Sequence, residues 1–340
     1  MIYQLNYNPF SDFWQNCQLN NVFSVLISVE PSYRHAAYLN DYSYYISENS
    51  IDNYSSARFL NLDYIGGIKK YIEDILIYKK VLDQDNRWSK VINIEKYYFN
   101  NNERFIEEIQ EKIKNGQVIS VGVNLFYWIK GSISYNQYHY NHYALITGYD
   151  DDKLQYNTFD DDLFGYKSHM IPEEQFRIAF LNSDCKEPPA YLISVCEDIQ
   201  PYKLSVYDVT TGARRVMDSI SKLNTDNIWG ICAAPNKFGE AVDNCVINAN
   251  RIVNRHQGNK LLFESLYSLG VVKNTDIIGK YICTENELIE GWIEVKNLIT
   301  LCKFSEKNCL PLEKLYELNK RLFDKEFSLW YNVVDVLYNL

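Results

Sequence analysis

The sequence predicts an α+β protein in which a helix packs on an antiparallel sheet and a mainly helical C-terminal region follows. Three observations lead to this fold class. An apolar pattern with helical spacing begins near the N-terminus, two adjacent strand patterns occupy residues 138–162, and helical spacing dominates beyond residue 201. Because the strands and the long helices are segregated along the chain, the arrangement is typical of α+β proteins rather than of alternating βαβ units.

The strand patterns between residues 138 and 162 predict a β-hairpin. Residues 143–149 are apolar and aromatic, which favours a buried strand. The run Asp150, Asp151 and Asp152 supplies turn residues, and residues 154–158 then alternate between apolar and polar side chains. We therefore expect two antiparallel strands joined by an acidic turn.

His142 and Asp160 lie at the open end of this predicted hairpin. His142 stands at the entry to the first strand and Asp160 at the exit of the second. Paired backbones are roughly 5 Å apart. A carboxylate at that distance can accept the imidazole N–H, which fixes the tautomer and leaves the other ring nitrogen free as a base. A hydrogen bond that merely closes a surface hairpin is the simpler alternative for the same two residues.

Cys17 opens the predicted N-terminal helix. Asn16 suits the N-cap position, and apolar residues between Leu19 and Leu26 follow at helical spacing until Pro31 ends the helix. The first turn of a helix favours a negative charge, so a cysteine there is favoured as a thiolate. Taken alone, a single cysteine is more often a small core residue than a nucleophile.

Other segments of the first 200 residues have plainer patterns. Residues 33–58 are rich in Tyr, Ser, Asn and Asp, and we expect loops with a short strand there. The remaining predicted elements are helices at 68–81 and 103–114, a buried strand at 117–126, a loop at 128–137, a short strand at 166–170, a helix from Pro172 and a strand at 190–196.

The best candidate for a domain boundary is the segment 197–204, which contains Pro201. We expect one domain at residues 1–200 and a mainly helical domain at residues 201–340. Helices in the second domain are predicted from apolar spacing at residues 209–223, 240–255, 261–269 and 312–337.

Composition excludes several classes of function. The net charge of −10 argues against a nucleic-acid partner, which requires clustered Lys and Arg. No apolar run approaches the ~20 residues of a membrane span, and residues 1–13 do not resemble a secretory signal, so we expect a cytoplasmic protein without a membrane partner. The eight cysteines are scattered without zinc spacing, and the aspartate runs lack a calcium-loop pattern, so no metal is expected.

Cys17, His142 and Asp160 together have the residue types of a catalytic triad. A cysteine nucleophile needs a histidine to take its proton, and the histidine needs a third group to orient it. The backbone N–H of Cys17 can serve as one oxyanion donor. The side chains of Gln15, Asn16 and Gln18 are candidates for a second donor, and the sequence does not choose among them. His139 could replace His142 if the strand had a different register.

Three stretches resemble the papain-like cysteine enzyme superfamily. They are N-C-Q-L-N-N at Cys17, K-N-G-Q-V-I-S-V-G-V before the hairpin, and H-Y-A-L-I-T-G-Y-D followed by Y-N-T-F-D. The chain is most similar to the N-terminal-like acyltransferases of butirosin-biosynthesis protein H, and more distantly to bacteriocin-processing peptidase domains. The resemblance covers about residues 10–200 and implies a papain-like fold in which Cys17 is the nucleophile, His142 the general base and acid, and Asp160 the orienting carboxylate.

The chain departs from the family pattern at two points. The family usually continues its hairpin with Asp-Pro, whereas here Asp160 is followed by Asp161 and Asp162. Any of the three carboxylates could therefore orient the histidine. The glutamine that usually supplies an upstream oxyanion donor is also not clearly placed.

The resemblance implies transfer of an acyl group from a carrier-protein thioester, through an acyl-Cys17 intermediate, to a small amine acceptor in nonribosomal peptide-type biosynthesis. The expected partners are an acyl or peptidyl carrier protein and the amine. No cofactor is expected beyond the phosphopantetheinyl group of the carrier. Two alternatives stay open: a cysteine peptidase, amidase or transglutaminase-like enzyme with the same triad, and a non-catalytic papain-like binding or scaffold protein.

Overall fold

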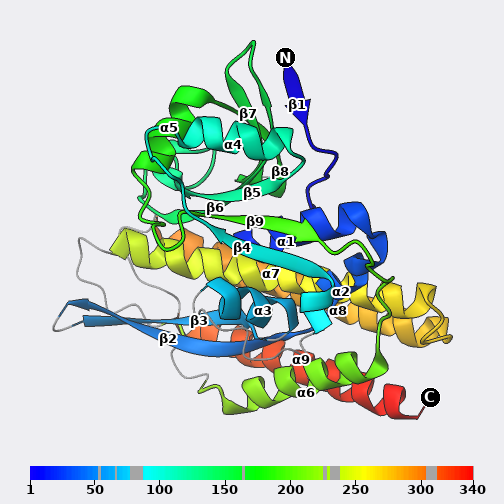
Figure 1. Ribbon diagram of the computed structural model, residues 1–340. Coiled ribbons are helices and arrows are strands. Elements are labelled where there is room, and N and C mark those ends of the chain that lie inside the picture. Colours follow the sequence, from blue (N-terminus) through cyan, green and yellow to red (C-terminus); the bar gives the residue numbers. More distant parts are fainter. Residues whose placement is uncertain are drawn as a thin grey trace. The chain divides into compact units, whose positions relative to one another are not determined.

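The structure is a computed structural model that describes residues 1–52, 55–65, 67–76, 87–162, 165–224, 228–229, 238–303 and 312–339. Its contacts divide the chain into two compact units. Unit 1 contains Met1–Arg34 and Gly67–Tyr202, and unit 2 contains His35–Gly66 and Lys203–Leu340. Strand pairing within the described residues is antiparallel, and the C-terminal part is helical (Figure 1). The predicted α+β class with a mainly helical C-terminal region is confirmed.

Unit 1 is built on one antiparallel sheet whose strands differ in length. The strands run in the order β4-β9-β5-β6-β7-β8, and β1 also pairs with β6. Its strands are β1 (Ile2–Gln4), β4 (Ile92–Tyr97), β5 (Val118–Asn124), β6 (Asn141–Asp150), β7 (Gln155–Asp162), β8 (Gly165–Pro172) and β9 (Ala190–Val195). Its helices are α1 (Cys17–Val29), α3 (Gly67–Leu76), α4 (Phe105–Lys114) and α5 (Glu173–Leu181), with short 3-10 turns at Pro31–Tyr33, Arg87–Lys90 and Leu125–Tyr127.

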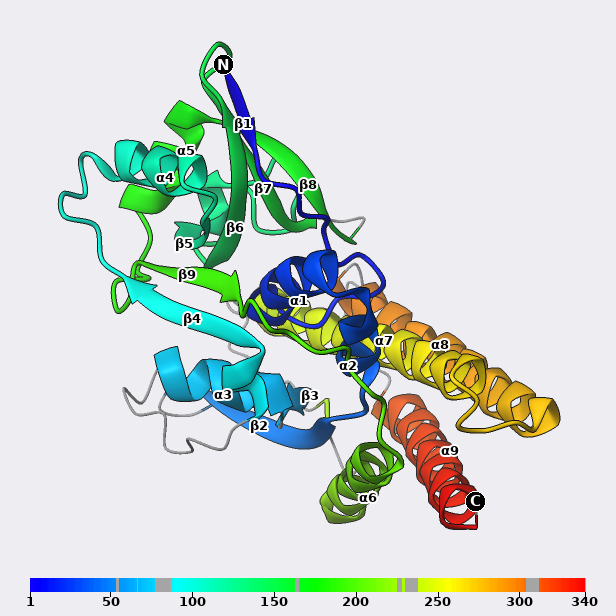
Figure 2. The same ribbon diagram turned by 45° about the vertical axis from the view of Figure 1, so that its right-hand side comes forward.

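Helices α4 and α5 cover one face of this sheet and enclose the main core of unit 1 (Figure 2). The apolar stripe of α4 recurs at helical spacing and is fully buried, so the helix has one face for the core and one for solvent. Phe105 of α4 stacks on Phe180 of α5 with ring centroids 4.0 Å apart. Strand β5 is buried along its whole length, as its run of apolar and β-branched residues predicts.

Unit 2 combines a two-stranded sheet with long helices. Helices α7 and α8 lie side by side in both views of the ribbon (Figures 1 and 2). The elements are α2 (Arg34–Tyr38), which begins at the border of the two units, β2 (Tyr42–Asp52), β3 (Ser55–Tyr64), α6 (Val206–Lys222), α7 (Phe238–Ser268), α8 (Thr275–Lys303) and α9 (Leu312–Tyr338).

Three expectations for these elements were wrong. Residues 33–58 are not mainly loop, because β2 and the start of β3 form a long ladder there. This segment also groups with the C-terminal helices, whereas the sequence placed it in the first domain. Finally, α7 is one continuous helix where two were expected, and α8 was not predicted. Residues 77–81 of the predicted helix 68–81 lie outside the described part of the chain.

Buried polar contacts explain why the β2–β3 hairpin belongs with the helices. The hydroxyl groups of Tyr42 and Tyr44 donate to the two carboxylate oxygens of Glu326 at 2.6 and 2.9 Å. The imidazole of His256 meets Glu285 at 2.7 Å, and all five of these side chains are almost fully buried. The tyrosine-rich strand β2, which lacks strong apolar alternation, is therefore held against the helices by hydrogen bonds to a buried charge. An analysis of hydrophobic periodicity does not detect such hydrogen bonds.

Among the helices in the described part of the chain, none combines the length and the apolar character that crossing a membrane demands.

Candidate active site

Cys17 is the first residue of helix α1, as the sequence predicts. The side chain of Asn16 caps the helix, because its carbonyl oxygen accepts the N–H of Leu19 at 2.9 Å. The first N–H groups of a helix have no partner within the helix and carry a partial positive charge. The Cys17 sulfur therefore lies where a negative charge is stabilised, and its side chain is partly exposed.

The loop that leads into Cys17 is held by polar residues of α1 itself. The amide of Asn20 donates to the carbonyl oxygens of Phe10 and Phe13, and its oxygen accepts the N–H of Gln15 at 2.9 Å. The hydroxyl of Ser24 accepts the N–H of Phe10 at 2.8 Å. These contacts fix the path of the chain immediately before the cysteine.

Asn21 anchors α1 to the sheet. Its amide group donates to the Ser120 hydroxyl of β5 and to the Tyr143 carbonyl oxygen of β6, both at 2.9 Å. Its oxygen accepts the hydroxyl of Tyr166 from β8 at 2.6 Å. A fully buried amide with this many partners holds the helix in one position, which keeps Cys17 at a constant distance from the end of the β6–β7 hairpin.

Strands β6 and β7 form the predicted hairpin and bring His142 to Asp160. Leu145 pairs with Phe159, and both His142 and Asp160 lie beyond this pair at the end away from the turn. Along β6, His142 is an odd number of residues from Leu145, and along β7, Asp160 is an odd number of residues from Phe159. Successive side chains of a strand alternate between its faces, so the side chains of His142 and Asp160 point to the opposite face from those of Leu145 and Phe159. The Nε2 atom of His142 donates to Oδ2 of Asp160 at 2.7 Å.

The charge on His142 is stabilised by two neighbours. Burial opposes the charged imidazolium, but the Asp160 carboxylate and a hydrogen bond and charge interaction with Cys17 outweigh this effect and raise the pKa of His142 well above its usual value. Because Nε2 is bound to Asp160, Nδ1 is the nitrogen that remains for Cys17. The structure thus brings together all three residues of the predicted triad.

Trp128 is a fourth member of the site that sequence reasoning missed. Its indole N–H donates to the same oxygen of Asp160 as His142, also at 2.7 Å, and its ring is fully buried. The side chain of Gln175 donates to the backbone carbonyl of Trp128. The sequence placed Trp128 in a loop, and no local pattern indicates that its N–H meets a carboxylate 32 residues away.

The three consecutive aspartates have different surroundings. Asp160 is buried and paired with His142, whereas Asp162 pairs with Lys167 at 2.7 Å. Burial, followed by repulsion from Asp160, raises the pKa of Asp161 to about 7. The uncertainty about which carboxylate contacts the imidazole is therefore resolved in favour of Asp160.

His139, the alternative to His142, lies away from Asp160. Its ring stacks on Phe126 with centroids 4.2 Å apart, and Nδ1 is 3.3 Å from the side-chain nitrogen of Asn124. The residue precedes β6 and is exposed. A different register of strand β6 would be needed to bring His139 to the Asp160 carboxylate, and the structure does not have that register.

The three candidate oxyanion residues flank Cys17 in different settings. The carbonyl oxygen of Asn16 is used in capping, and Gln15 is only 3% exposed. Gln18 lies in the first turn of α1 and is partly exposed. All three are within two residues of the sulfur, and the contacts of the described chain do not single out one of them as the second donor.

A second cysteine, Cys185, also lies beside the site. Its sulfur is 3.9 Å from the backbone oxygen of His142, and burial raises the pKa of its thiol. A Cβ atom on Gly122 would come 2.3 Å from the Cβ of Cys185, so the glycine of strand β5 permits this close approach. No motif in the sequence predicted that Cys185 is near His142.

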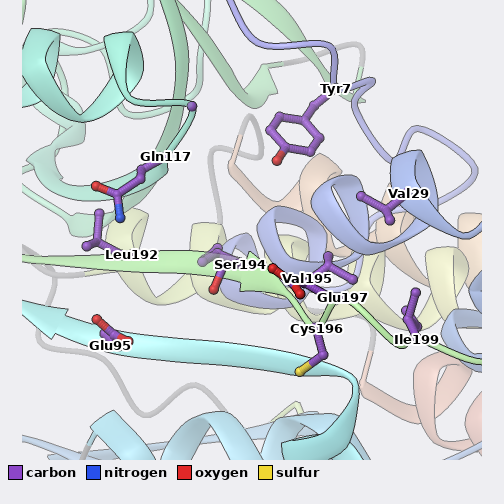
Figure 3. A pocket seen from close by; sticks show the side chains of 12 residues that line it. Tyr7, Val29, Glu95, Gln117, Leu192, Ser194, Val195, Cys196, Glu197 and Ile199 are labelled. Carbon is purple, nitrogen blue, oxygen red and sulfur yellow. The ribbon is translucent and has the colours of Figure 1, made fainter.

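A hollow of about 320 Å³ lies elsewhere in unit 1 and does not include the triad (Figure 3). Its walls include Tyr7, Gln117, Ser194 and Val29. Val29 ends the helix that Cys17 begins, and twelve residues of α-helix span roughly 18 Å. The wall at Val29 therefore lies at the far end of α1 from the sulfur.

Neither protein-family models nor curated proteins provide a match for this sequence. The assignment of a function therefore depends on the geometry of the site and on the resemblance of its motifs to papain-like enzymes.

Proposed function

We propose that the chain is a cysteine-dependent acyltransferase with a papain-like catalytic unit, in which Cys17 carries the acyl group. The observation that supports this most strongly is the pairing of His142 with Asp160 through Nε2, together with the interaction between His142 and Cys17. A nucleophile, a base and an orienting carboxylate in this order are the minimum machinery of thiol-based acyl transfer.

The first half of the proposed reaction loads the enzyme. The Cys17 thiolate attacks the carbonyl carbon of a thioester, and the new C–S bond forms as the bond to the donor thiol breaks. The departing thiolate takes the proton of the His142 imidazolium. The free N–H groups of the first turn of α1 stabilise the oxyanion of the tetrahedral intermediate. One thioester replaces another, so this step has little thermodynamic cost.

The second half transfers the acyl group to an amine. The amine attacks the acyl-Cys17 carbonyl, a C–N bond forms, and the C–S bond breaks to release the Cys17 thiolate. His142 takes the proton lost by the amine, which restores the imidazolium–thiolate pair. Asp160 keeps Nε2 protonated throughout, because its carboxylate is held in place by two donors, His142 and Trp128.

The donor and the acceptor in this proposal come from the motif resemblance. The donor would be an acyl or peptidyl group on the phosphopantetheine arm of a carrier protein, and the acceptor would be a small amine in nonribosomal peptide-type biosynthesis. Because a peptidase or amidase uses the same triad, the acceptor distinguishes the two reactions.

The test is a product analysis with a pantetheine thioester as donor. The protein is incubated with the thioester in the presence and absence of a small primary amine, with Cys17→Ala as control. We expect the amide to accumulate faster than the free acid when the amine is present, and neither to form with the variant. Formation of free acid alone would contradict acyl transfer and favour hydrolysis.

A further inference from the structure

Cys185 lies on the face of strand β5 that helix α1 covers. The Ser120 hydroxyl of β5 accepts a hydrogen bond from Asn21 of α1 at 2.9 Å, so its side chain is on that face. Gly122 follows two residues later, and side chains two residues apart in a strand point to the same face. A Cβ atom on Gly122 would come 2.3 Å from Cβ and 3.2 Å from Sγ of Cys185. Cys185 therefore occupies the space over Gly122, on the side of α1.

Cys17 approaches the same place from α1. It precedes Asn21 by one helical turn, and a turn advances about 5.4 Å, which is close to the ~6.8 Å that two residues of a strand span. Cys17 interacts with His142, which lies at the Gly122 end of the β5–β6 pair. The step from Asn21 to Cys17 therefore runs toward Gly122 and brings the Cys17 sulfur toward Cys185.

His142 and Tyr143 are neighbours of both sulfur atoms. The imidazole of His142 interacts with Cys17, and its backbone oxygen is 3.9 Å from the sulfur of Cys185. Burial, followed by the charges of Cys185 and Cys17, raises the pKa of the Tyr143 hydroxyl. Burial also raises the pKa of the Cys185 thiol, and the charge of Cys17 acts in the same direction. The two cysteines thus share their surroundings at the start of β6.

The settings of the two cysteines suit the two partners of a disulfide. Cys17 has a helix N-terminus and an imidazolium beside it, which favour the thiolate, and the thiolate is the form that peroxides oxidise. Cys185 lies in the loop between α5 and β9, where its N–H donates to the Ser183 hydroxyl at 3.1 Å. A loop residue can shift more readily than one within a strand or a helix to reach the geometry of a disulfide.

We propose that Cys17 and Cys185 form a reversible disulfide when the protein meets a hydroperoxide. The Cys17 thiolate attacks one oxygen of hydrogen peroxide, the O–O bond breaks, and the departing hydroxide takes the proton of the His142 imidazolium to leave as water. The product on Cys17 is a sulfenic acid. The Cys185 thiol then attacks that sulfur, the S–O bond breaks, and the hydroxyl group leaves with the thiol proton as a second water. Peroxide is thereby reduced, and the two cysteines are oxidised to one disulfide.

The disulfide regulates the candidate active site because it removes the nucleophile. While the bond is present, acyl transfer stops and Cys17 is protected from irreversible oxidation to sulfinic acid. A dithiol reductant restores both cysteines by exchange. The effect on acyl transfer rests on the proposed function, whereas formation of the bond does not.

The test detects the bond without any acyl substrate. Full-length protein is reduced, freed of reductant and treated with a small molar excess of hydrogen peroxide, and the remaining thiols are alkylated with iodoacetamide in denaturant. Intact mass and peptide mapping then locate the linked cysteines. The variants are Cys185→Ser and the matched control Cys196→Ser. Cys196 is also a partly exposed cysteine of unit 1, and its sulfur likewise contacts a backbone oxygen, that of Ser89 at 3.8 Å.

We expect the wild type and Cys196→Ser to lose the mass of two hydrogen atoms and to yield a peptide that links Cys17 to Cys185, which dithiothreitol cleaves. Cys185→Ser should yield no such peptide, and its Cys17 should accumulate as sulfinic acid. The mapping of the wild type decides the question even if Cys185→Ser does not fold. Wild-type protein whose Cys17 stays alkylatable, becomes only sulfinic acid or links to another cysteine would overturn the proposal.

The same samples are assayed for acyl transfer, so that failure of this inference can be told apart from failure of the proposed function. Transfer activity should disappear in the linked protein and return after treatment with dithiothreitol. A linked peptide in protein that never transfers acyl groups would support the disulfide and contradict the proposed function. Transfer activity in protein that forms no link would contradict only the disulfide.

Discussion

His142 and Trp128 donate hydrogen bonds to the same carboxylate oxygen, Oδ2 of Asp160, and both distances are 2.7 Å. Two donors on one oxygen hold the carboxylate in a single orientation and stabilise its charge. The orientation of the imidazole therefore depends on a tryptophan as well as on the aspartate. This relationship makes the role of Trp128 testable apart from its packing.

Replacing Trp128 with Phe keeps an aromatic ring but removes the N–H donor. We expect the rate of Cys17 alkylation by iodoacetamide near neutral pH to fall by about tenfold, because a hydrogen bond to a charged group contributes about 1.5–3 kcal/mol. The free energy of unfolding should also fall, since the smaller ring leaves a cavity.

The matched control for Trp128 is Trp88→Phe. Trp88 is also buried in unit 1, at 3% exposure, and its ring packs against Tyr33 rather than against the triad. This variant should lose stability without a change in the alkylation rate of Cys17. An equal decrease of that rate in both variants would mean that Trp128 acts only through packing.

Substitutions of Asp160 and Asp162 should differ sharply in their effect on activity. Asp160→Asn leaves a side chain of the same shape but removes the charge that stabilises the imidazolium, so we expect acyl transfer to fall by roughly 10²–10⁴-fold. Asp162→Asn weakens the ion pair with Lys167, which does not involve His142, and should stay within a few-fold of the wild type. Steady-state rates with a thioester donor measure both, and similar losses in the two variants would contradict the assignment of Asp160.

The raised pKa of His142 predicts a specific pH dependence. Because the pKa lies above 6.5, the imidazolium persists to higher pH than in an ordinary histidine, and its positive charge lies beside the sulfur of Cys17. At a given pH below the His142 pKa, alkylation of Cys17 should therefore be faster in the wild type than in a variant without this charge. His142→Gln removes the positive charge, so its alkylation profile should shift to more alkaline pH. Identical profiles for the variant and the wild type would show that the pair does not form.

Unit 2 should lose stability as the pH rises. Burial opposes the charge on His256, but Glu285 and Glu326 raise its pKa above 6.5, and burial raises the pKa of Glu285 as well. A folded-state pKa above the unfolded value stabilises the fold at low pH and loses this contribution as the pH increases through the folded value. Arg255, Tyr42 and both glutamates contribute charge or hydrogen bonds to the same network.

Hydrogen exchange of the β2–β3 strands measures this effect, because Tyr42 and Tyr44 hold the hairpin on Glu326. We expect faster exchange at pH 9 than at pH 6, after correction for the intrinsic rate. In His256→Gln the difference between the two pH values should be smaller. Protection that is independent of pH in the wild type would contradict the role of the buried imidazolium.

The predicted parts of the site are those encoded in short stretches of sequence. A cap, an apolar stripe and Pro31 define α1, and the strand patterns with an acidic turn define the β6–β7 hairpin. The positions of Cys17, His142 and Asp160 follow from these local patterns. Their interaction was inferred from the chemistry that such residue types perform together.

The parts that could not be predicted depend on contacts between distant segments. Trp128 contacts Asp160 from the segment before β6, and Cys185 contacts the His142 backbone from the loop before β9. Likewise Tyr42 and Tyr44 of β2 donate hydrogen bonds to Glu326, which is 284 and 282 residues away in the sequence. Neither periodicity nor residue spacing contains information about such pairings.

The central claim is that Cys17 forms the acyl-enzyme, and intact-protein mass spectrometry after incubation with a pantetheine thioester tests it most directly. Cys185→Ala serves as a control, because its thiol lies beside His142 and could be acylated in place of Cys17. We expect the mass of one acyl group on the wild type and on Cys185→Ala, with the modified peptide containing Cys17, and no added mass on Cys17→Ala. An acyl adduct that persists on Cys17→Ala would contradict the account.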